Sequence, residues 1–377
     1  MTEIFLFGTL CHAPLRHAVA GGELPARPAV LPGCAVAQVR GASWPVLVDC
    51  AGAQAEGLVI EAGGEALARL DYYEACFGYV RQPVTVEIDG RARRVEVWRP
   101  EADGAAGAVL PGGRWSLEDW ARDWGDLSRI AAAEVMAQRA GGATAAEVGQ
   151  RYWMICARAQ SQISAGAWQR PALAGANLGR DAVELVERRH PYTKFFTVEE
   201  LAIRHRQFDG TLSGVQERAV FRVADAVTVL PYDPRRDRIL LVEQIRLGAY
   251  AHGDAHPWLL EPVAGMIDAG ETPEAAARRE TVEEAGLTLG ELHHVGRYYP
   301  SPGGIAQVMI SYVGIADLPD AVTGLGGHAG EGEDILSHVV EWETACAMLK
   351  GGDMANAPLI LSFQWLVMNR DRLRASG

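Results

Sequence analysis

The stretch "GMIDAGETPEAAARRETVEEAGL", residues 265–287, collects acidic side chains at a regular spacing. Glu280, Glu283 and Glu284 are three and four residues apart, so a helix would place them on one face, one turn from each other. Like charges at these spacings repel one another and destabilise the helix. The pattern therefore indicates that a positive group neutralises this face.

Helix signals frame the same stretch. Thr272 is a candidate N-cap, Pro273 fits the first helical position, and Gly286 fits a C-terminal cap. Arg279 precedes Glu283 by four residues and is expected to pair with it. The apolar face of this helix is expected to consist of Ala276, Val282 and Leu287.

The stretch also fits the longer pattern G-x5-E-x7-R-E-U-x-E-E-x-G-U, in which U is usually Ile, Leu or Val. Thr281 stands at the first U position. The remaining fixed positions are filled by Gly265, Glu271, Arg279, Glu280, Glu283, Glu284, Gly286 and Leu287. This pattern is the Nudix box, so the segment resembles the Nudix hydrolases.

The resemblance implies hydrolysis of a diphosphate with a divalent cation. Hard cations accept carboxylate oxygens, neutralise phosphates and acidify bound water. By resemblance, Glu280 and Glu284 are the main ligands of Mg²⁺, with Mn²⁺ as the alternative ion. The backbone carbonyl of Ala264 is a further ligand, and Glu283 supports catalysis.

The flanking sequence resembles the ADP-ribose pyrophosphatase branch of the Nudix family from about Tyr192 to Leu373. Pro302 stands fifteen residues beyond Leu287, where this branch typically has a proline that contacts substrate. The implied reaction converts ADP-ribose and water to AMP and ribose 5-phosphate. Hydrolysis of other nucleoside diphosphate sugars, or a ligand-binding sensor without turnover, is the alternative. The segments that carry the resemblance are "LLVEQIRLGAY", "PWLLEPVAGMIDAGE", "YYPSPGG", "GEGEDI" and "NAPLILSFQWL".

Further roles follow from the resemblance, position by position. Glu333 resembles another metal ligand, and Glu331, in the glycine-rich loop 321–332, resembles the general base. One departure is Gln307, where the branch often has a glutamate. The residues that resemble substrate contacts are Arg218 and Arg246, on the adenosine and phosphate sides, and Glu261.

A second resemblance lies at the N-terminus. "FGTL", residues 7–10, resembles the Y-G-[ST]-L loop of the γ-glutamylcyclotransferase-like family, with Phe7 in place of tyrosine. In that family the loop, here Gly8, Thr9 and Leu10, holds the carboxylate of a γ-glutamyl compound. Glu74 in "LDYYE" falls at the catalytic glutamate, which moves a proton as 5-oxoproline forms. Fusions of the two families resemble proteins described as tellurite-resistance factors.

The order of patterns predicts an α+β protein with three parts. Residues 1–100 are expected to form a γ-glutamylcyclotransferase-like β-barrel domain with a helix. Its "EIDGRARRVEV" segment signals a hairpin turning at Asp89-Gly90. Residues 101–185 are expected to be a linker with helices, starting with a Gly/Ala/Pro stretch. Residues 186–377 are expected to form a Nudix α/β/α sandwich.

The composition argues against several classes of protein and of site. The net charge of −13 over 377 residues argues against binding along nucleic-acid backbones. The six cysteines are scattered, which fits reduced thiols rather than a disulfide framework or a zinc site. No apolar run reaches the length of a membrane span and no signal peptide is evident, so a cytoplasmic protein is expected.

By resemblance, the strands within residues 194–210 would exchange between the subunits of a homodimer.

Overall fold

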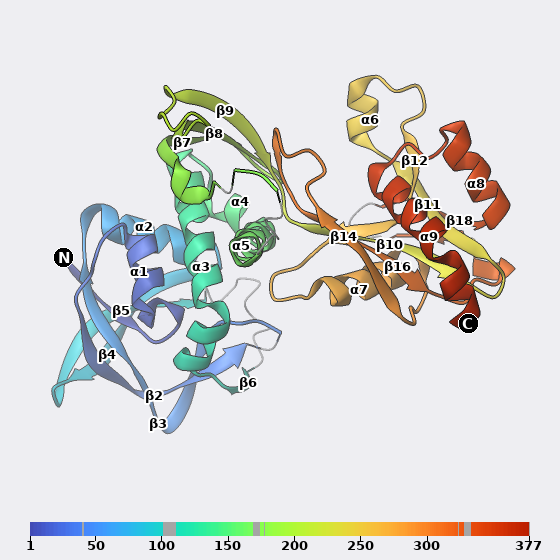
Figure 1. The fold of residues 1–377 in the computed structure, drawn as a ribbon. Helices are drawn as coiled ribbons and strands as arrows, with labels where there is room; N and C mark the ends of the chain where they lie inside the picture. The colour runs from blue at the N-terminus through green and yellow to red at the C-terminus, as the bar shows by residue number, and fades with distance from the viewer. Residues whose placement is uncertain are drawn as a thin grey trace. The chain divides into compact units, whose positions relative to one another are not determined.

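The structure is a computed structural model that describes residues 1–39, 41–100, 111–168, 174–176, 178–322, 324–327 and 333–376. The chain divides into two compact units, Met1–Glu217 and Arg218–Gly377 (Figure 1). Both units contain helices and sheets, so the predicted α+β class is confirmed. The three predicted domain ranges remain predictions.

The first unit begins with β-strands and continues with helices. Strand β1 pairs with β3 and β5, β4 pairs with β5 and β2, and β3 also pairs with β2. The elements are β1 (Thr2–Leu6), η1 (Thr9–Cys11), α1 (Ala13–Ala20), β2 (Ala26–Val39), β3 (Pro45–Ala62), α2 (Gly64–Ala75), β4 (Tyr79–Ile88), β5 (Arg91–Pro100), β6 (Pro111–Arg114), α3 (Leu117–Ala140), α4 (Ala145–Gln150), α5 (Tyr152–Ala167), η3 (Arg180–Ala182), β7 (Val183–Thr193) and β8 (Thr197–His205).

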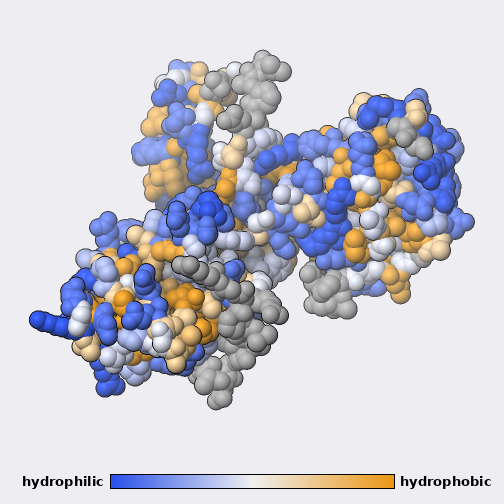
Figure 2. Space-filling view, turned by 90° about the horizontal axis from the view of Figure 1, so that it is seen from below, coloured by the Kyte–Doolittle hydropathy of each residue, from blue (hydrophilic) through white to orange (hydrophobic). Residues whose placement is uncertain are grey.

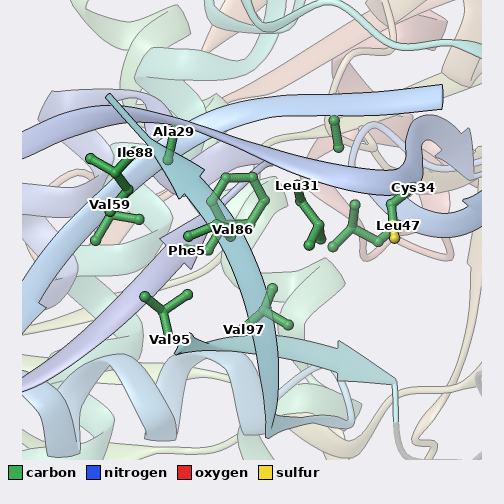
Figure 3. Packing of buried hydrophobic residues seen from close by; sticks show 11 residues of the cluster. Phe5, Ala29, Leu31, Cys34, Leu47, Val59, Val86, Ile88, Val95 and Val97 are labelled. Carbon is green, nitrogen blue, oxygen red and sulfur yellow. The ribbon is translucent and has the colours of Figure 1, made fainter. Parts of the chain in front are cut away.

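The strands of this unit enclose an apolar core (Figure 3). The predicted hairpin is confirmed, since Asp89 and Gly90 join β4 to β5 with φ values of 49° and 72°. Positive φ at both positions matches the twist of a two-residue hairpin. The buried cluster consists of Phe5, Ala29, Leu31, Cys34, Leu47, Ala55, Val59, Val86, Ile88, Val95 and Val97.

The helices α3, α4 and α5 follow the strands. Ser116 caps α3 by accepting the N–H of Asp119, as its sequence indicates. Part of the Gly/Ala/Pro stretch at the start of the predicted linker is a strand, since residues 111–114 form β6, which pairs with β2. Thr144 and Glu147 form a capping box at the start of α4, which ends at Gln150, shortly before α5 begins at Tyr152.

The second unit is built around one sheet of mixed direction. Its strands run in the order β14-β16-β10-β11-β18-β17, with β13 on β10 and β12 on β11. The elements are β9 (Gln216–Arg222), whose first two residues precede the unit, β10 (Ala226–Asp233), β11 (Arg238–Ile245), α6 (Leu247–His252), β12 (Trp258–Glu261), β13 (Val263–Met266), α7 (Pro273–Ala285), β14 (Leu292–Tyr298), β15 (Ile305–Ala306), β16 (Met309–Ile315), η4 (Asp320–Val322), β17 (Gly324–Gly326), β18 (Ile335–Glu341), α8 (Trp342–Gly351) and α9 (Ala357–Ser376).

Two helices of this unit pack on opposite faces of β10. Leu230 and Tyr232 belong to one buried cluster with Leu359 and Phe363 of α9. Val229 points the other way, because side chains alternate along a strand. The side chains of Val229 and Leu289 lie close together, because a Cβ added at Gly314 would stand 3.0 Å from the first and 2.8 Å from the second. Leu289 follows α7 in the chain. The sheet therefore holds α7 rigidly on the face opposite α9.

Hydrophobic and hydrophilic residues are mixed over the face of the molecule in Figure 2. Among the residues that the structure describes, none of the helices is long and apolar enough to cross a membrane.

Candidate functional site

The helix α7 forms as its sequence predicts. Thr272 accepts the N–H of Ala275 at 3.2 Å, and Pro273 occupies the first turn, where its missing N–H costs nothing. Gly286 ends the helix with φ of 63°, a left-handed conformation that glycine adopts without strain. The caps therefore fix where the helix begins and ends.

The buried face of α7 differs from the expected one. Val282 was expected in the apolar face but is 54% exposed, because the helix turns Thr281 and Glu284 toward the sheet instead. Thr281 is fully buried, and its hydroxyl donates to the carbonyl of Ala277 at 2.7 Å. This bond satisfies the polar group where the motif usually has an apolar residue. The expected burial of Ala276 is confirmed.

Two glutamates of α7 reach across to strand β13. The Ala264 N–H donates to a carboxylate oxygen of Glu284 at 3.1 Å, and Glu284 is almost fully buried. The carboxyl group of Glu280 lies over Gly265, where a Cβ would stand 1.9 Å from the carboxyl carbon of Glu280. The glycine of the motif is thus needed because the glutamate occupies the space of its side chain.

The pKa values of both glutamates are raised. Burial raises the pKa of Glu280 to about 7, and the nearby charges of Glu283 and Glu333 add to the shift, opposed by Arg279. Burial raises the pKa of Glu284 to about 8, with contributions from Glu280 and Glu333, opposed by the bond from Ala264 and by Arg246. The charge of Glu333 thus acts on both carboxylates. Buried carboxylates that raise each other's pKa form a set of hard oxygen donors that a divalent cation would stabilise.

The described residues contain no group of three or more His, Cys, Asp and Glu side chains already arranged to hold a metal ion. Arg279 instead partners several of the acids. It donates to Glu283 at 3.0 Å, as predicted, and also to Glu280 at 2.6 Å and to Glu271 at 2.9 Å. The arginine thereby links the helix to the loop that precedes it.

A second charged network lies beside these carboxylates. Arg246 donates through Nε to Glu261 at 2.5 Å, and the Asn356 side-chain amide donates to the other oxygen of Glu261 at 2.6 Å. Glu261 is buried, whereas the Arg246 side chain is 37% exposed. The positive charge of Arg246 opposes the raised pKa of Glu284. The structure thus brings Arg246 and Glu261 together, and it adds Asn356, for which sequence reasoning gave no role.

In the first unit, the predicted ligand-binding loop forms a single turn. The N–H of Cys11 donates to Gly8 at 2.9 Å, and the His12 N–H donates to Thr9 at 3.0 Å. A Cβ at Gly8 would lie 3.0 Å from the Pro45 ring. Leu10 is buried, so its side chain belongs to the core and only its backbone remains for a ligand.

Glu74 lies in the last turn of α2. Burial raises the pKa of Glu74 to about 8, and the neighbouring charge of Asp71 adds to the shift. No described arginine, lysine or histidine forms an ion pair with Glu74. Arg81 pairs with Asp71 instead, at 2.8 Å. An acid with a pKa near neutral and no cationic partner is suited to accept and release a proton.

The end of α2 is held by the helices that follow the strands. The Tyr72 hydroxyl donates to the carbonyl of Ala143 at 2.7 Å, and the rings of Phe77 and Tyr152 are 4.8 Å apart. A Cβ at Gly149 would lie 2.2 Å from the carbonyl oxygen of Cys76. Sequence reasoning did not predict this contact, because the spacing of residues 143–152 carries no sign of what they pack against.

Comparison with known proteins finds one family match in the C-terminal half of the chain and another in the N-terminal part. Residues 222–360 match the family described as "NUDIX domain", and residues 4–117 match "Gamma-glutamyl cyclotransferase, AIG2-like". A relative named "ADP-ribose pyrophosphatase" from Escherichia coli (strain K12) is 40% identical over 196 residues, which are 52% of this chain and 93% of the relative. The chain belongs to the Nudix family.

Other Nudix relatives show a range of named substrates. An "ADP-ribose pyrophosphatase" of Haemophilus influenzae is 36% identical over 55% of this chain and 97% of its own length. A "GDP-mannose pyrophosphatase" of Enterobacter sp. (strain 638) is 30% identical over 40% of this chain and 77% of its own length.

Among the remaining predicted residues of the Nudix unit that the structure describes, two are exposed and one forms a side-chain hydrogen bond. Glu331 lies outside the described residues. Arg218 is exposed on β9, and Pro302 is exposed in the turn between β14 and β15. Gln307 donates its amide to the carbonyl of Ala224 at 2.9 Å, a bond that an ionised glutamate could not make. The roles of these residues remain predictions.

Proposed function

We propose that the Nudix unit hydrolyses ADP-ribose to AMP and ribose 5-phosphate in the presence of Mg²⁺. The observation that carries the proposal is the pair of glutamates at β13, the partly buried Glu280 and the almost fully buried Glu284. The relatives named ADP-ribose pyrophosphatase, which are 36–40% identical, support this substrate. The relative named GDP-mannose pyrophosphatase makes other nucleoside diphosphate sugars the alternative.

Mg²⁺ would be held by Glu280, Glu284 and the carbonyl of Ala264, with Glu333 beside them. The N–H and C=O of one strand residue point to the same side, so the Ala264 carbonyl faces the side on which Glu284 binds its N–H. When bound, the ion would supply positive charge for the diphosphate and acidify a water molecule.

The chain's own residues would then position substrate and move protons. Arg246 would keep its Nε on Glu261 and use the outer nitrogens of its guanidinium to bind a phosphate. Glu331 would take a proton from the attacking water, as its position in the family implies. Arg279 would release Glu280 and Glu283 to the cation and remain on Glu271.

The test is AMP formation from ADP-ribose by the full chain with Mg²⁺, compared with Glu284→Gln. Wild type should form AMP, and the variant should lose most of the rate. A wild type that forms no AMP, or a variant as fast as wild type, would refute the proposal. GDP-mannose, tested in parallel, distinguishes the alternative substrate class.

A second activity is proposed for the first unit because Glu74 has a raised pKa and no cationic partner among the described residues. Glu74 would move a proton from the α-amine of a γ-glutamyl compound to its departing amine, as the α-amine attacks the γ-carbonyl, the γ-amide C–N bond breaks and 5-oxoproline forms. The test is 5-oxoproline release from a panel of γ-glutamyl compounds. Release that persists in Glu74→Gln would contradict this role.

A further inference from the structure

Asn356 stands at the start of α9 and uses both ends of its side-chain amide. Its oxygen accepts the N–H of Leu359 at 3.1 Å, which makes it the N-cap of the helix. Its nitrogen donates to Glu261 at 2.6 Å. Leu359 is fully buried in the core, so the cap has a fixed position against the sheet. The amide group therefore cannot turn without losing one of the two bonds.

The contact with Glu261 matters because that carboxylate is buried and shared. One of its oxygens accepts from Asn356 and the other from Arg246 at 2.5 Å. Only 6% of the Glu261 side chain is exposed, so water cannot readily replace either donor. Asn356 thus fixes the rotation of Glu261, and Glu261 fixes the direction of the Arg246 guanidinium.

We propose that Asn356 is a positioning residue for substrate binding, because it orients Arg246 through Glu261 toward the diphosphate held beside Glu284. This inference rests on the proposed hydrolysis of ADP-ribose. It assigns Asn356 no contact with the reacting atoms. Its loss would therefore weaken substrate binding while the carboxylates of α7 continue to do the chemistry.

Two substitutions separate positioning from helix capping. Asn356→Ser and Asn356→Asp both retain an oxygen that caps α9. The ionised aspartate cannot donate to Glu261 and places a negative charge against it. The serine hydroxyl ends one bond closer to the backbone than the amide nitrogen that donates to Glu261, so it serves as the shorter variant. The matched control is Asn369→Asp on the same helix, where the amide donates only to the carbonyl of Trp365 at 2.9 Å.

Steady-state kinetics with ADP-ribose should show a rise in KM of about 10- to 100-fold for the Asn356 variants, with the larger effect for aspartate. The kcat values should stay within about twofold of wild type, since the lost interaction acts on binding. Melting temperatures should fall for both variants, more for aspartate, because a buried oxygen of Glu261 loses its donor while α9 keeps its cap. Adding Glu261→Gln to Asn356→Asp should recover part of the KM, because the glutamine amide can donate to the aspartate.

The exchange rate of the Arg246 Nε proton with solvent tests the positioning role without any enzymatic turnover. Nuclear magnetic resonance of the full chain should show slow exchange of this proton in wild type and Asn369→Asp, and faster exchange in Asn356→Asp. Equal exchange in wild type and Asn356→Asp, or an unchanged KM, would overturn the inference. A wild type without AMP formation but with this difference in exchange would refute the proposed substrate and leave the positioning role supported.

Discussion

Each unit has a glutamate near the end of a helix whose pKa is raised by burial, but the surroundings of these glutamates differ. Glu74 on α2 has Asp71 as a charged neighbour, and Asp71 is itself paired with Arg81. Glu284 on α7 has Glu280 and Glu333 beside it and the Ala264 backbone in front of it. Both pKa values are raised to about 8. A single acid with a raised pKa is suited to proton transfer, whereas a group of acids that raise each other's pKa is suited to bind a cation.

The largest effects are expected when each of the two glutamates is replaced by glutamine in a separate variant. Glu284→Gln should lower kcat/KM for ADP-ribose by about 100- to 1,000-fold, because a carboxylate ligand is lost. Glu74→Gln should leave AMP formation unaffected and abolish 5-oxoproline release. Rates of both products, measured for both variants, check this. The comparison between the two sites fails if one variant abolishes both activities.

A smaller loss is expected from Gly265→Ala. Its new Cβ would stand where the Glu280 carboxyl group lies, so the glutamate must leave its place over β13. AMP formation should fall by about 10- to 100-fold, comparable to the cost of overpacking a tight site. Gly166→Ala is the control, since no atom lies within 4 Å of that added Cβ. Equal rates for the two variants would show that Glu280 tolerates displacement.

Gly149→Ala tests the first unit in the same way. The added Cβ would press on the carbonyl oxygen of Cys76, two residues beyond Glu74, and move the last turn of α2. Hydrogen exchange of the Tyr72–Gly78 amides should quicken by roughly 10-fold, with AMP formation unchanged. Gly166→Ala again serves as the control. Protection equal to wild type would show that α4 does not hold this turn.

The smallest effect concerns pH and stability. Glu74 has a pKa near 4.3 when unfolded and about 8 when folded, so its contribution to stability is fully present below about pH 4.3 and is lost as pH rises to about 8. Glu74→Gln removes this dependence, so its melting temperature should rise relative to wild type between about pH 5 and 8. Glu65→Gln is the control, because Arg139 lowers the pKa of Glu65 instead. A constant difference between Glu74→Gln and wild type across this range would contradict the raised pKa.

Much of α7 and its surroundings could be predicted because local signals fix them. Thr272, Pro273 and Gly286 set the helix ends, and the motif spacing places Glu280 and Glu284 together. The buried face of α7 was harder to predict. The residue that turns toward the sheet is Glu284, which accepts a backbone N–H, and not an apolar residue. Val282 was therefore assigned wrongly.

Contacts between distant segments were not predictable from the sequence. Asn356 lies 95 residues from Glu261, and Gly149 lies over 70 residues from the carbonyl of Cys76 that it touches. The sequence signals in these residues are local, an N-cap and a helical glycine, and neither signal specifies a partner. Tertiary packing alone gives these residues their positions beside the two sites.

The most direct test of the difference between the two glutamates is Mn²⁺ binding by the full chain, measured by electron paramagnetic resonance, with Mn²⁺ as a probe for Mg²⁺. Wild type and Glu74→Gln should bind Mn²⁺ with equal affinity, and Glu284→Gln should bind it at least about tenfold more weakly. Equal affinity in wild type and Glu284→Gln would contradict the assignment of the α7 carboxylates as a cation site.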